Sequence, residues 1–297
     1  MFDLRYHVAS LAAVFFALVI GILVGVALAS HGLGNTERKR LERQVDAANA
    51  RAARAEDKVA TLTDQGKANA DFVDKGYLAV MTDRLQGRHI AVLFIGKVNG
   101  DILDSIRQTL SDADAPDRLR LRALTVPLDV AAIDGILDGH PPLAAYAGEK
   151  KLDDLGRELA DEFVLGGETP VWDALQDHLV GERSGTMRRP ADGIVVVRTA
   201  QPQMAGTADF LRGLYSGLAD RPIPVVAVEA SNAKPSAVRT FRRYSISTVD
   251  DIDRPVGRVA LALLLADAPG GAYGTKKTAT DGALPEVLPI STPGAGG

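Results

Sequence analysis

The sequence predicts an α/β protein in three parts: one N-terminal transmembrane helix, a helical coiled-coil stalk, and a three-layer, mostly parallel α/β head domain. Three observations lead to this prediction. A long run without charge lies near the start, a polar heptad pattern follows it, and short apolar runs then alternate with amphipathic segments. We place the parts at residues 1–7 (N-terminal flank), 8–30 (transmembrane helix), 31–66 (stalk), 67–269 (head domain) and 270–297 (disordered tail).

The apolar run covers Val8–Ser30, which is 23 residues without a charged side chain. As a helix it is about 34 Å long, enough to cross a hydrocarbon core of about 30 Å. A cleaved signal peptide is the alternative, because Ala27-Leu28-Ala29 fits the small-x-small cleavage pattern. The apolar part of a signal peptide is usually about 7–15 residues long. The length therefore favours an uncleaved anchor in the lipid bilayer.

Two features predict that two chains associate through their helices. Gly21 and Gly25 form a GxxxG pair, which lets helix backbones approach closely in lipid. Beyond the span, residues 36–63 contain no Gly or Pro and carry apolar or small residues in alternating steps of four and three. That seam consists of Leu41, Val45, Ala48, Ala52, Ala55, Val59 and Leu62. We expect a homodimer joined by span and stalk; a single solvated helix is the alternative.

The head domain is predicted from alternating strand-like and helix-like segments. The expected strands are His89–Gly96, Leu119–Val126, Gly193–Thr199, Ile223–Glu229 and a short piece near 244–248. The expected helices are 101–110, 130–137, 152–165, 171–179, 205–219, 235–241 and 255–266. Three strands are near-continuous Val/Ile/Leu runs, which are typical of parallel strands buried on both faces. Leu119–Val126 instead alternates Leu and Arg, so we expect an edge strand with one face in water.

Composition excludes several classes of protein. The net charge of −4 gives no basic excess, so no nucleic-acid partner is expected. The absence of Cys removes disulfides, thiolate metal sites and Cys nucleophiles. From Gly270 onward the chain is rich in Gly, with few large apolar residues, and this predicts a disordered tail.

Catalytic motifs are absent from the sequence. The turn Gly96–Asp101 after the first strand lacks both GxGxxG and GxxxxGK[ST] spacing, so we expect an ordinary turn with Asn99, Gly100 or Asp101 as helix cap. There is no GxSxG elbow. The five histidines form no pair at metal-ligand spacing, and the four methionines form no cluster. We therefore predict no enzyme and identify no cofactor.

One acidic patch stands out in the sequence. Asp250, Asp251 and Asp253 are candidate ligands for a hard cation, which prefers carboxylate oxygens. The stronger alternative is structural. These carboxylates precede a helix that begins near Pro255, where they could cap free N–H groups and meet the positive end of the helix dipole.

The same C-terminal stretch carries a family resemblance. Ile246–Asp253, then Pro255, Gly257-Arg258 and Gly271–Thr275, together with the opening Leu4–Phe15, resemble the mycobacterial copper transporter B (MctB) family. The resemblance implies an envelope protein linked to copper homeostasis, with a role in copper efflux and a pore-like role at the outer envelope. Copper is implied only by this resemblance. The chain is also similar to actinobacterial membrane proteins whose stalks act in cell-wall and division control.

The side of the membrane is left open by charge alone. Arg5 precedes the span, whereas Arg38, Lys39, Arg40 and Arg43 follow it among acidic residues. We expect a single-pass envelope protein with an extracytoplasmic head and a role in copper homeostasis or transport. The first alternative is a non-enzymatic scaffold or regulator that acts through its stalk on a cell-wall or division partner. The second is an enzyme that uses the crevice of the α/β sheet.

Overall fold

The computed structural model describes residues 4–28, 34–116 and 119–287. Several predicted parts therefore have ends outside the described residues. These are positions 1–3 of the flank, 29–30 of the predicted span, 31–33 of the stalk and 288–297 of the tail. The chain divides into two compact units, Met1–Asp71 and Phe72–Gly297.

The first unit consists of one whole helix and most of a second, whose last residues belong to the second unit. Helix α1 spans Leu4–Leu28, and helix α2 spans Gly34–Met81, well past the expected end of the stalk at residue 66. Within α1, Ser10–Ala27 is long and apolar enough to cross a bilayer, and none of its side chains is buried. Helix α2 is rich in Ala, Arg and Lys, which are strong helix formers, and after its first residue, Gly34, its only glycines are Gly66 and Gly76.

The second unit contains a seven-stranded sheet in the order β3-β2-β1-β4-β5-β6-β7. All neighbouring strands are parallel except β2 and β3. The strands are β1 (Ile90–Ile95), β2 (Arg120–Leu124), β3 (Val180–Ser184), β4 (Gly193–Arg198), β5 (Val225–Val228), β6 (Ser247–Val249) and β7 (Ala272–Tyr273). The predicted mostly parallel α/β architecture is confirmed.

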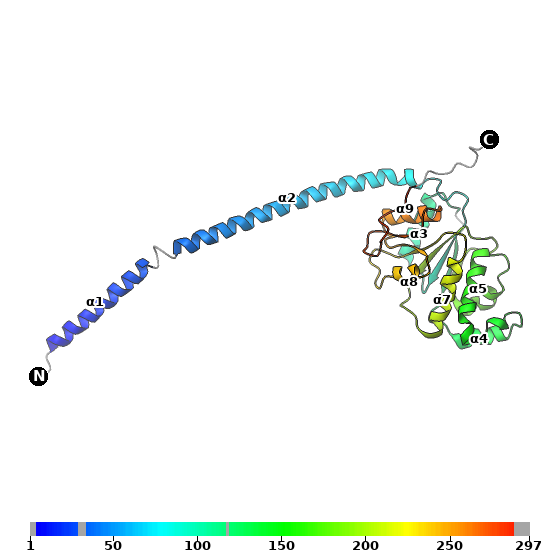
Figure 1. Ribbon diagram of the computed structural model, residues 1–297, viewed down its shortest axis with the longest axis horizontal. Helices are drawn as coiled ribbons and strands as arrows, with labels where there is room; N and C mark the ends of the chain where they lie inside the picture. Colours follow the sequence, from blue (N-terminus) through cyan, green and yellow to red (C-terminus); the bar gives the residue numbers. More distant parts are fainter. Residues whose placement is uncertain (1–3, 29–33, 117–118, 288–297) are drawn as a thin grey trace. The chain divides into compact units, whose positions relative to one another are not determined.

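Helices cover both faces of this sheet (Figure 1). One face carries α3 (Gly100–Asp112) and α9 (Pro255–Leu265). The other carries α4 (Val130–Asp138), α5 (Leu152–Leu165), α6 (Pro170–Leu179), α7 (Ala205–Ala219) and α8 (Val238–Arg242). Two short 3-10 helices, η2 (Ala144–Tyr146) and η3 (Glu149–Lys151), lead into α5. Sheet and helices together form the three predicted layers.

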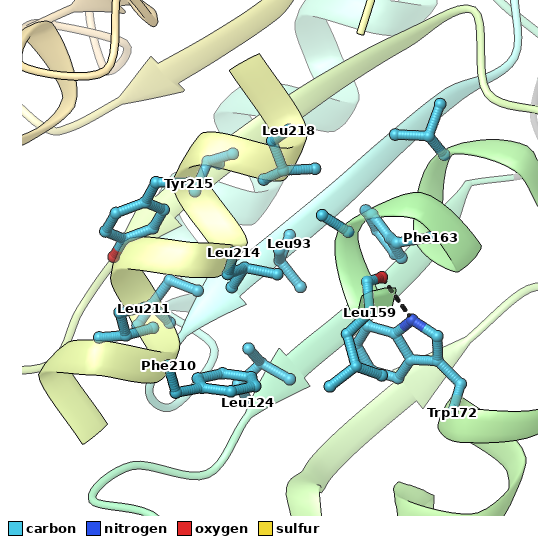
Figure 2. Packing of buried hydrophobic residues seen from close by; sticks show 14 of the residues in the cluster. Leu93, Leu124, Leu159, Phe163, Trp172, Phe210, Leu211, Leu214, Tyr215 and Leu218 are labelled. Atoms are coloured by element: carbon cyan, nitrogen blue, oxygen red, sulfur yellow. Dashed lines mark hydrogen bonds between the residues drawn. The ribbon is translucent and has the colours of Figure 1, made fainter. Parts of the chain in front are cut away.

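The sheet separates two apolar cores, and the central strand β1 contributes side chains to both. In β1, Leu93 and its alternate neighbours face the α5–α7 side, whereas Phe94 and its alternate neighbours face the α3–α9 side. This is the two-residue period of a strand buried on both faces. Figure 2 shows the first core, where the Trp172 ring lies 5.8 Å from that of Phe163 and its Nε1–H donates to the Leu159 carbonyl at 2.8 Å.

Helices α5 and α7 meet backbone to backbone. A Cβ added at Gly213 would overlap the carbonyl of Asp153, and one added at Gly156 would overlap the carbonyl of Phe210. One added at Gly217 would lie 2.8 Å from Ala160 Cβ. Because glycine has no side chain, these two helices pack closer than ordinary side chains allow.

The structure contradicts the prediction that Leu119–Val126 is a wet edge strand. Strand β2 lies inside the sheet between β1 and β3, and β3 forms the edge. Arg120 is 6% exposed, because its guanidinium donates to the carbonyls of Phe163, Thr186 and Arg189 instead of facing water. The Leu/Arg alternation therefore reflects arginines that bind backbone carbonyls.

The predicted disordered tail is also corrected for residues 270–287. Ala272 and Tyr273 form β7, which pairs with β6 in parallel register. Asp281 accepts a hydrogen bond from the Ala272 N–H at 2.7 Å and returns one to its carbonyl at 3.0 Å. Backbone pairing and polar side chains hold this segment in place, so its low content of apolar residues wrongly predicted disorder.

Candidate functional site

The aspartates predicted as a site lie where β6 ends, but each has a different environment. Asp250 is fully buried and accepts hydrogen bonds from the N–H groups of Thr275 and Lys276 and from the Thr278 hydroxyl, the last at 2.6 Å. Asp253 accepts two bonds of 2.6 Å from the N–H and hydroxyl of Ser231. The two carboxylates therefore fasten separate loops.

Asp251 is the exception among the three. Its side chain is fully buried, and neither carboxyl oxygen has a hydrogen-bond partner among the described residues. Burial raises its pKa, the Thr275 side chain opposes this shift, and the neighbouring charges of Asp250 and Asp253 add to it. For Asp253 the Ser231 bonds outweigh partial burial and lower the pKa. Asp251 is thus the member of the patch for which the charged form is disfavoured.

None of these aspartates has the predicted helix-capping role. Helix α9 begins at Pro255 with Arg254 at the N-cap position and no side-chain cap. The Asp251 backbone carbonyl packs against Gly257, and no side chain could be added there without overlap. By contrast, Asn99 does cap α3, as predicted, by accepting from the Ile102 N–H at 3.0 Å.

Sequence reasoning missed two charged residues beside this patch. Glu229 follows β5 as Asp250 follows β6, and its side chain accepts from the Ala237 N–H at 2.7 Å. Lys276 donates to Glu229 at 2.8 Å and to the Ala230 carbonyl at 2.6 Å. The signal in the sequence was an acidic residue directly after each of two buried strands. The carboxyl ends of parallel strands lie at the same edge of a sheet, so residues in these positions come close together.

The strand order reverses between β1 and β4, where doubly wound sheets often bind ligands. Here the two strand ends are in direct contact. Ile95 accepts hydrogen bonds from the N–H groups of Thr199 and Ala200, both at 3.0 Å, and the Thr199 hydroxyl donates to Lys97 at 2.7 Å. A Cβ added at Gly96 would lie 2.7 Å from that hydroxyl. Backbone therefore occupies the position nearest the reversal.

Metal ligands do not gather in the described part of the chain. Among its residues, no group of three or more His, Asp or Glu is placed to hold an ion. His89 lies 3.2 Å from Asp192, and His140 contacts the Ile136 carbonyl at 2.8 Å. A cation site at Asp250, Asp251 and Asp253 stays a prediction.

The features predicted to pair two chains lie in the first unit. Gly21 and Gly25 fall on α1, and a Cβ at either would have no neighbour within 4 Å. On α2 the larger seam residues are exposed in the single chain, at 52–64% of their surface. These are Leu41, Val45, Val59 and Leu62.

Comparison with known proteins identifies the family. A family model described as "Copper transport outer membrane protein, MctB" matches residues 1–284. Proteins named "Copper transporter MctB" from Mycobacterium bovis and from two strains of Mycobacterium tuberculosis are 25% identical over 315 aligned residues. The alignment covers 92% of this chain and 95% of each relative. The apolar N-terminal helix, the long second helix and the α/β domain thus all lie within the match, and the chain belongs to the MctB family.

Proposed function

We propose that this chain is a single-pass, membrane-anchored envelope protein that acts in copper homeostasis or transport. The observation that carries the proposal is the family match over residues 1–284, which includes both α1 and the head domain. The match is to a family described by copper transport and an outer membrane, and the relatives are named copper transporters. Helix α1 has the length and apolar surface that an anchor needs.

Copper content in cells tests the proposed role. We expect a strain that lacks the gene to accumulate copper and to lose copper tolerance. The full chain should restore both, whereas a chain without residues 4–28 should not. Cell zinc measured in parallel is the control for general envelope damage. Unchanged copper content and tolerance in the deletion strain would contradict the proposal.

We further propose that the head lies on the extracytoplasmic side. Basic residues after the span alternate with acidic ones, as in the exposed pair Arg38–Glu42 at 3.3 Å, and long domains translocate largely regardless of charge. The chain has no Cys, so a single Ser111→Cys on the exposed end of α3 gives labelling without background. A membrane-impermeant maleimide should label it in intact cells. Labelling only after lysis would contradict this topology.

A second candidate function is a non-enzymatic scaffold that acts as a homodimer through its stalk. The exposed apolar seam on α2 favours it, because Val45 and Val59 leave more than half of their surface in water in the single chain. Contact between the ends of β1 and β4 also supports a head without a catalytic crevice. Envelope proteins captured by the full chain, compared with a chain lacking residues 36–65, would identify a partner that depends on the stalk.

A further inference from the structure

A cavity of about 700 Å³ lies at the amino end of β1 and β2, away from the aspartates at the carboxyl end of β6. Its walls come from the start of these two strands, from α3 and from the loop between β3 and β4. Known ligand pockets have volumes of roughly 300–1,000 Å³, so this cavity has room for a small organic molecule.

The charged lining of this cavity is wholly basic among the described residues. Four arginines and one histidine contribute to it, and no carboxylate does. These are Arg107, Arg120, Arg188, Arg189 and His89. The whole chain carries a net charge of −4, so this is a local excess of positive charge that the composition conceals.

Most of this positive charge has no carboxylate opposite it among the residues that the structure describes. The side chains of Arg188 and Arg189 are exposed and make no ion pair or hydrogen bond with the described residues. Arg107 reaches Asp104 only at 3.5 Å, with both side chains more than half exposed, which is a weak interaction. His89 is paired with Asp192. Three arginines with weak or absent ion pairs therefore face one cavity.

Arg120 forms the inner wall and organises the loop. Its three backbone acceptors are neutral carbonyls, and the Phe163 ring lies 5.9 Å from its guanidinium. Two of those acceptors, Thr186 and Arg189, lie in the loop that also carries Arg188. Burial, aided by Arg122, lowers its pKa to about 10, so it keeps its charge at neutral pH. A buried cation without a counter-charge is costly, and an anion in the cavity would supply one.

We propose that this arginine-lined cavity binds a phosphorylated organic molecule. Guanidinium groups bind phosphate oxygens through paired hydrogen bonds. Several arginines together match the double negative charge of a phosphate ester better than the single charge of a carboxylate. The volume exceeds that of phosphate alone, so the phosphate is part of a larger molecule. Two sources share this chemistry: a soluble phosphate ester and a phospholipid headgroup.

Titration calorimetry on the full chain in neutral detergent tests the proposal. The probes are inorganic pyrophosphate as the minimal anion, glycerol 1-phosphate as a soluble ester and dihexanoyl phosphatidylglycerol as a lipid. We expect saturable pyrophosphate binding that weakens when NaCl rises from about 0.05 M to about 0.5 M. Tighter binding of glycerol 1-phosphate than of the lipid would assign a soluble ligand, and the reverse order would assign a lipid headgroup.

Paired substitutions locate the binding. The double variant Arg188→Gln/Arg189→Gln should weaken pyrophosphate binding about tenfold or more, because it removes two charge-assisted interactions with the phosphate oxygens. Arg120 is left intact, since its bonds hold the loop. The matched control is Arg242→Gln/Arg243→Gln, an exposed adjacent pair at the end of α8, which should bind as the wild type does.

Three results would overturn the proposal. The first is no saturable binding of any phosphate probe to the wild-type chain. The second is equal loss of binding in the two double variants, which would indicate nonspecific attraction to basic residues. The third is succinate binding as tightly as pyrophosphate, which would show that the cavity does not select phosphate.

Discussion

The ammonium group of Lys276 lies 2.8 Å from a carboxylate oxygen of Glu229, and this ion pair joins the C-terminal segment to the end of β5. The Glu229 side chain is 6% exposed and that of Lys276 is 20% exposed, so the pair is largely removed from water. The other Glu229 oxygen accepts from the Ala237 N–H. One carboxylate therefore connects strand β5, the approach to α8 and the segment that follows β7.

Removing Lys276 should destabilise the head domain. Lys276→Met leaves a buried carboxylate without its counter-charge, at a cost of about 2–3 kcal/mol. For a domain of this size the melting temperature should fall by roughly 4–12 °C. Thermal unfolding of the full chain in detergent, followed by circular dichroism, measures this change.

The neighbouring lysine provides the control. Lys277 is exposed and its side chain makes no hydrogen bond or ion pair with the described residues, so Lys277→Met should shift the melting temperature by less than about 2 °C. Equal shifts for both variants would show that the Lys276–Glu229 pair does not stabilise the fold.

Local pattern was sufficient to predict most of the head domain. Strand β1 reads Ile-Ala-Val-Leu-Phe-Ile, and such a run has few alternatives to a strand buried on both faces. Strand β3 was missed because Val180–Ser184 is a mostly exposed edge strand without apolar alternation. What identifies β3 is its pairing with β2, in which Arg122 lies opposite Arg183.

The candidate site was predicted less well, because its contacts are distant in sequence. Asp250 and Thr278 are 28 residues apart, and Glu229 and Lys276 are 47 apart. Nothing in the local pattern links them, so the aspartates were interpreted through the nearest helix. The arginine-lined cavity was missed for the same reason, because its walls come from β1, β2, α3 and the β3–β4 loop.

Two Gly→Ala substitutions should have opposite effects, because one glycine lies in the close contact between α5 and α7 and the other has open space around it. Gly213→Ala would place a methyl group against the Asp153 carbonyl, and we expect a loss of about 3 kcal/mol or more in the free energy of unfolding. Gly135→Ala on α4 has no atom within 4 Å of the new methyl group. It should gain about 0.5–1 kcal/mol, because alanine favours helix.

Urea unfolding of both variants measures this pair of effects. A neutral Gly213→Ala would mean that the two helices separate easily, and that close backbone packing is not required there. A Gly135→Ala variant that loses stability would show that α4 is constrained by something other than helix propensity.

Glu162 predicts a pH-dependent contribution to stability. It is buried and accepts from the N–H groups of Val171 and Trp172 at the start of α6. Burial raises its pKa above the ordinary 4.5, although the two backbone bonds oppose the shift. The folded state therefore favours the protonated form. The stability that comes from protonated Glu162 is fully present below pH 4.5, and it is lost as the pH rises through the pKa of Glu162 in the folded state.

The variant Glu162→Gln isolates this effect, since glutamine stays neutral. We expect its free energy of unfolding, relative to wild type, to increase as the pH is raised from about 4 to about 7. The exposed Glu149→Gln gives the background for loss of one surface carboxylate. A relative stability of Glu162→Gln that falls with pH would mean that the charged form of Glu162 is the one favoured by folding.

The seam on α2 predicts which positions of the stalk meet in a dimer. In the heptad pattern Val45 lies on the seam, whereas Ala50, five residues later, lies on the opposite face of the helix. Both are exposed in the single chain, and the natural sequence contains no Cys.

Val45→Cys should form a disulfide-linked dimer in membranes under mild oxidation, because seam residues bring their Cα atoms within the roughly 4.4–6.8 Å that a disulfide needs. Ala50→Cys should stay mostly monomeric. Monomer alone from Val45→Cys would exclude this seam as the dimer contact, and equal dimer from both would indicate random collision in the bilayer.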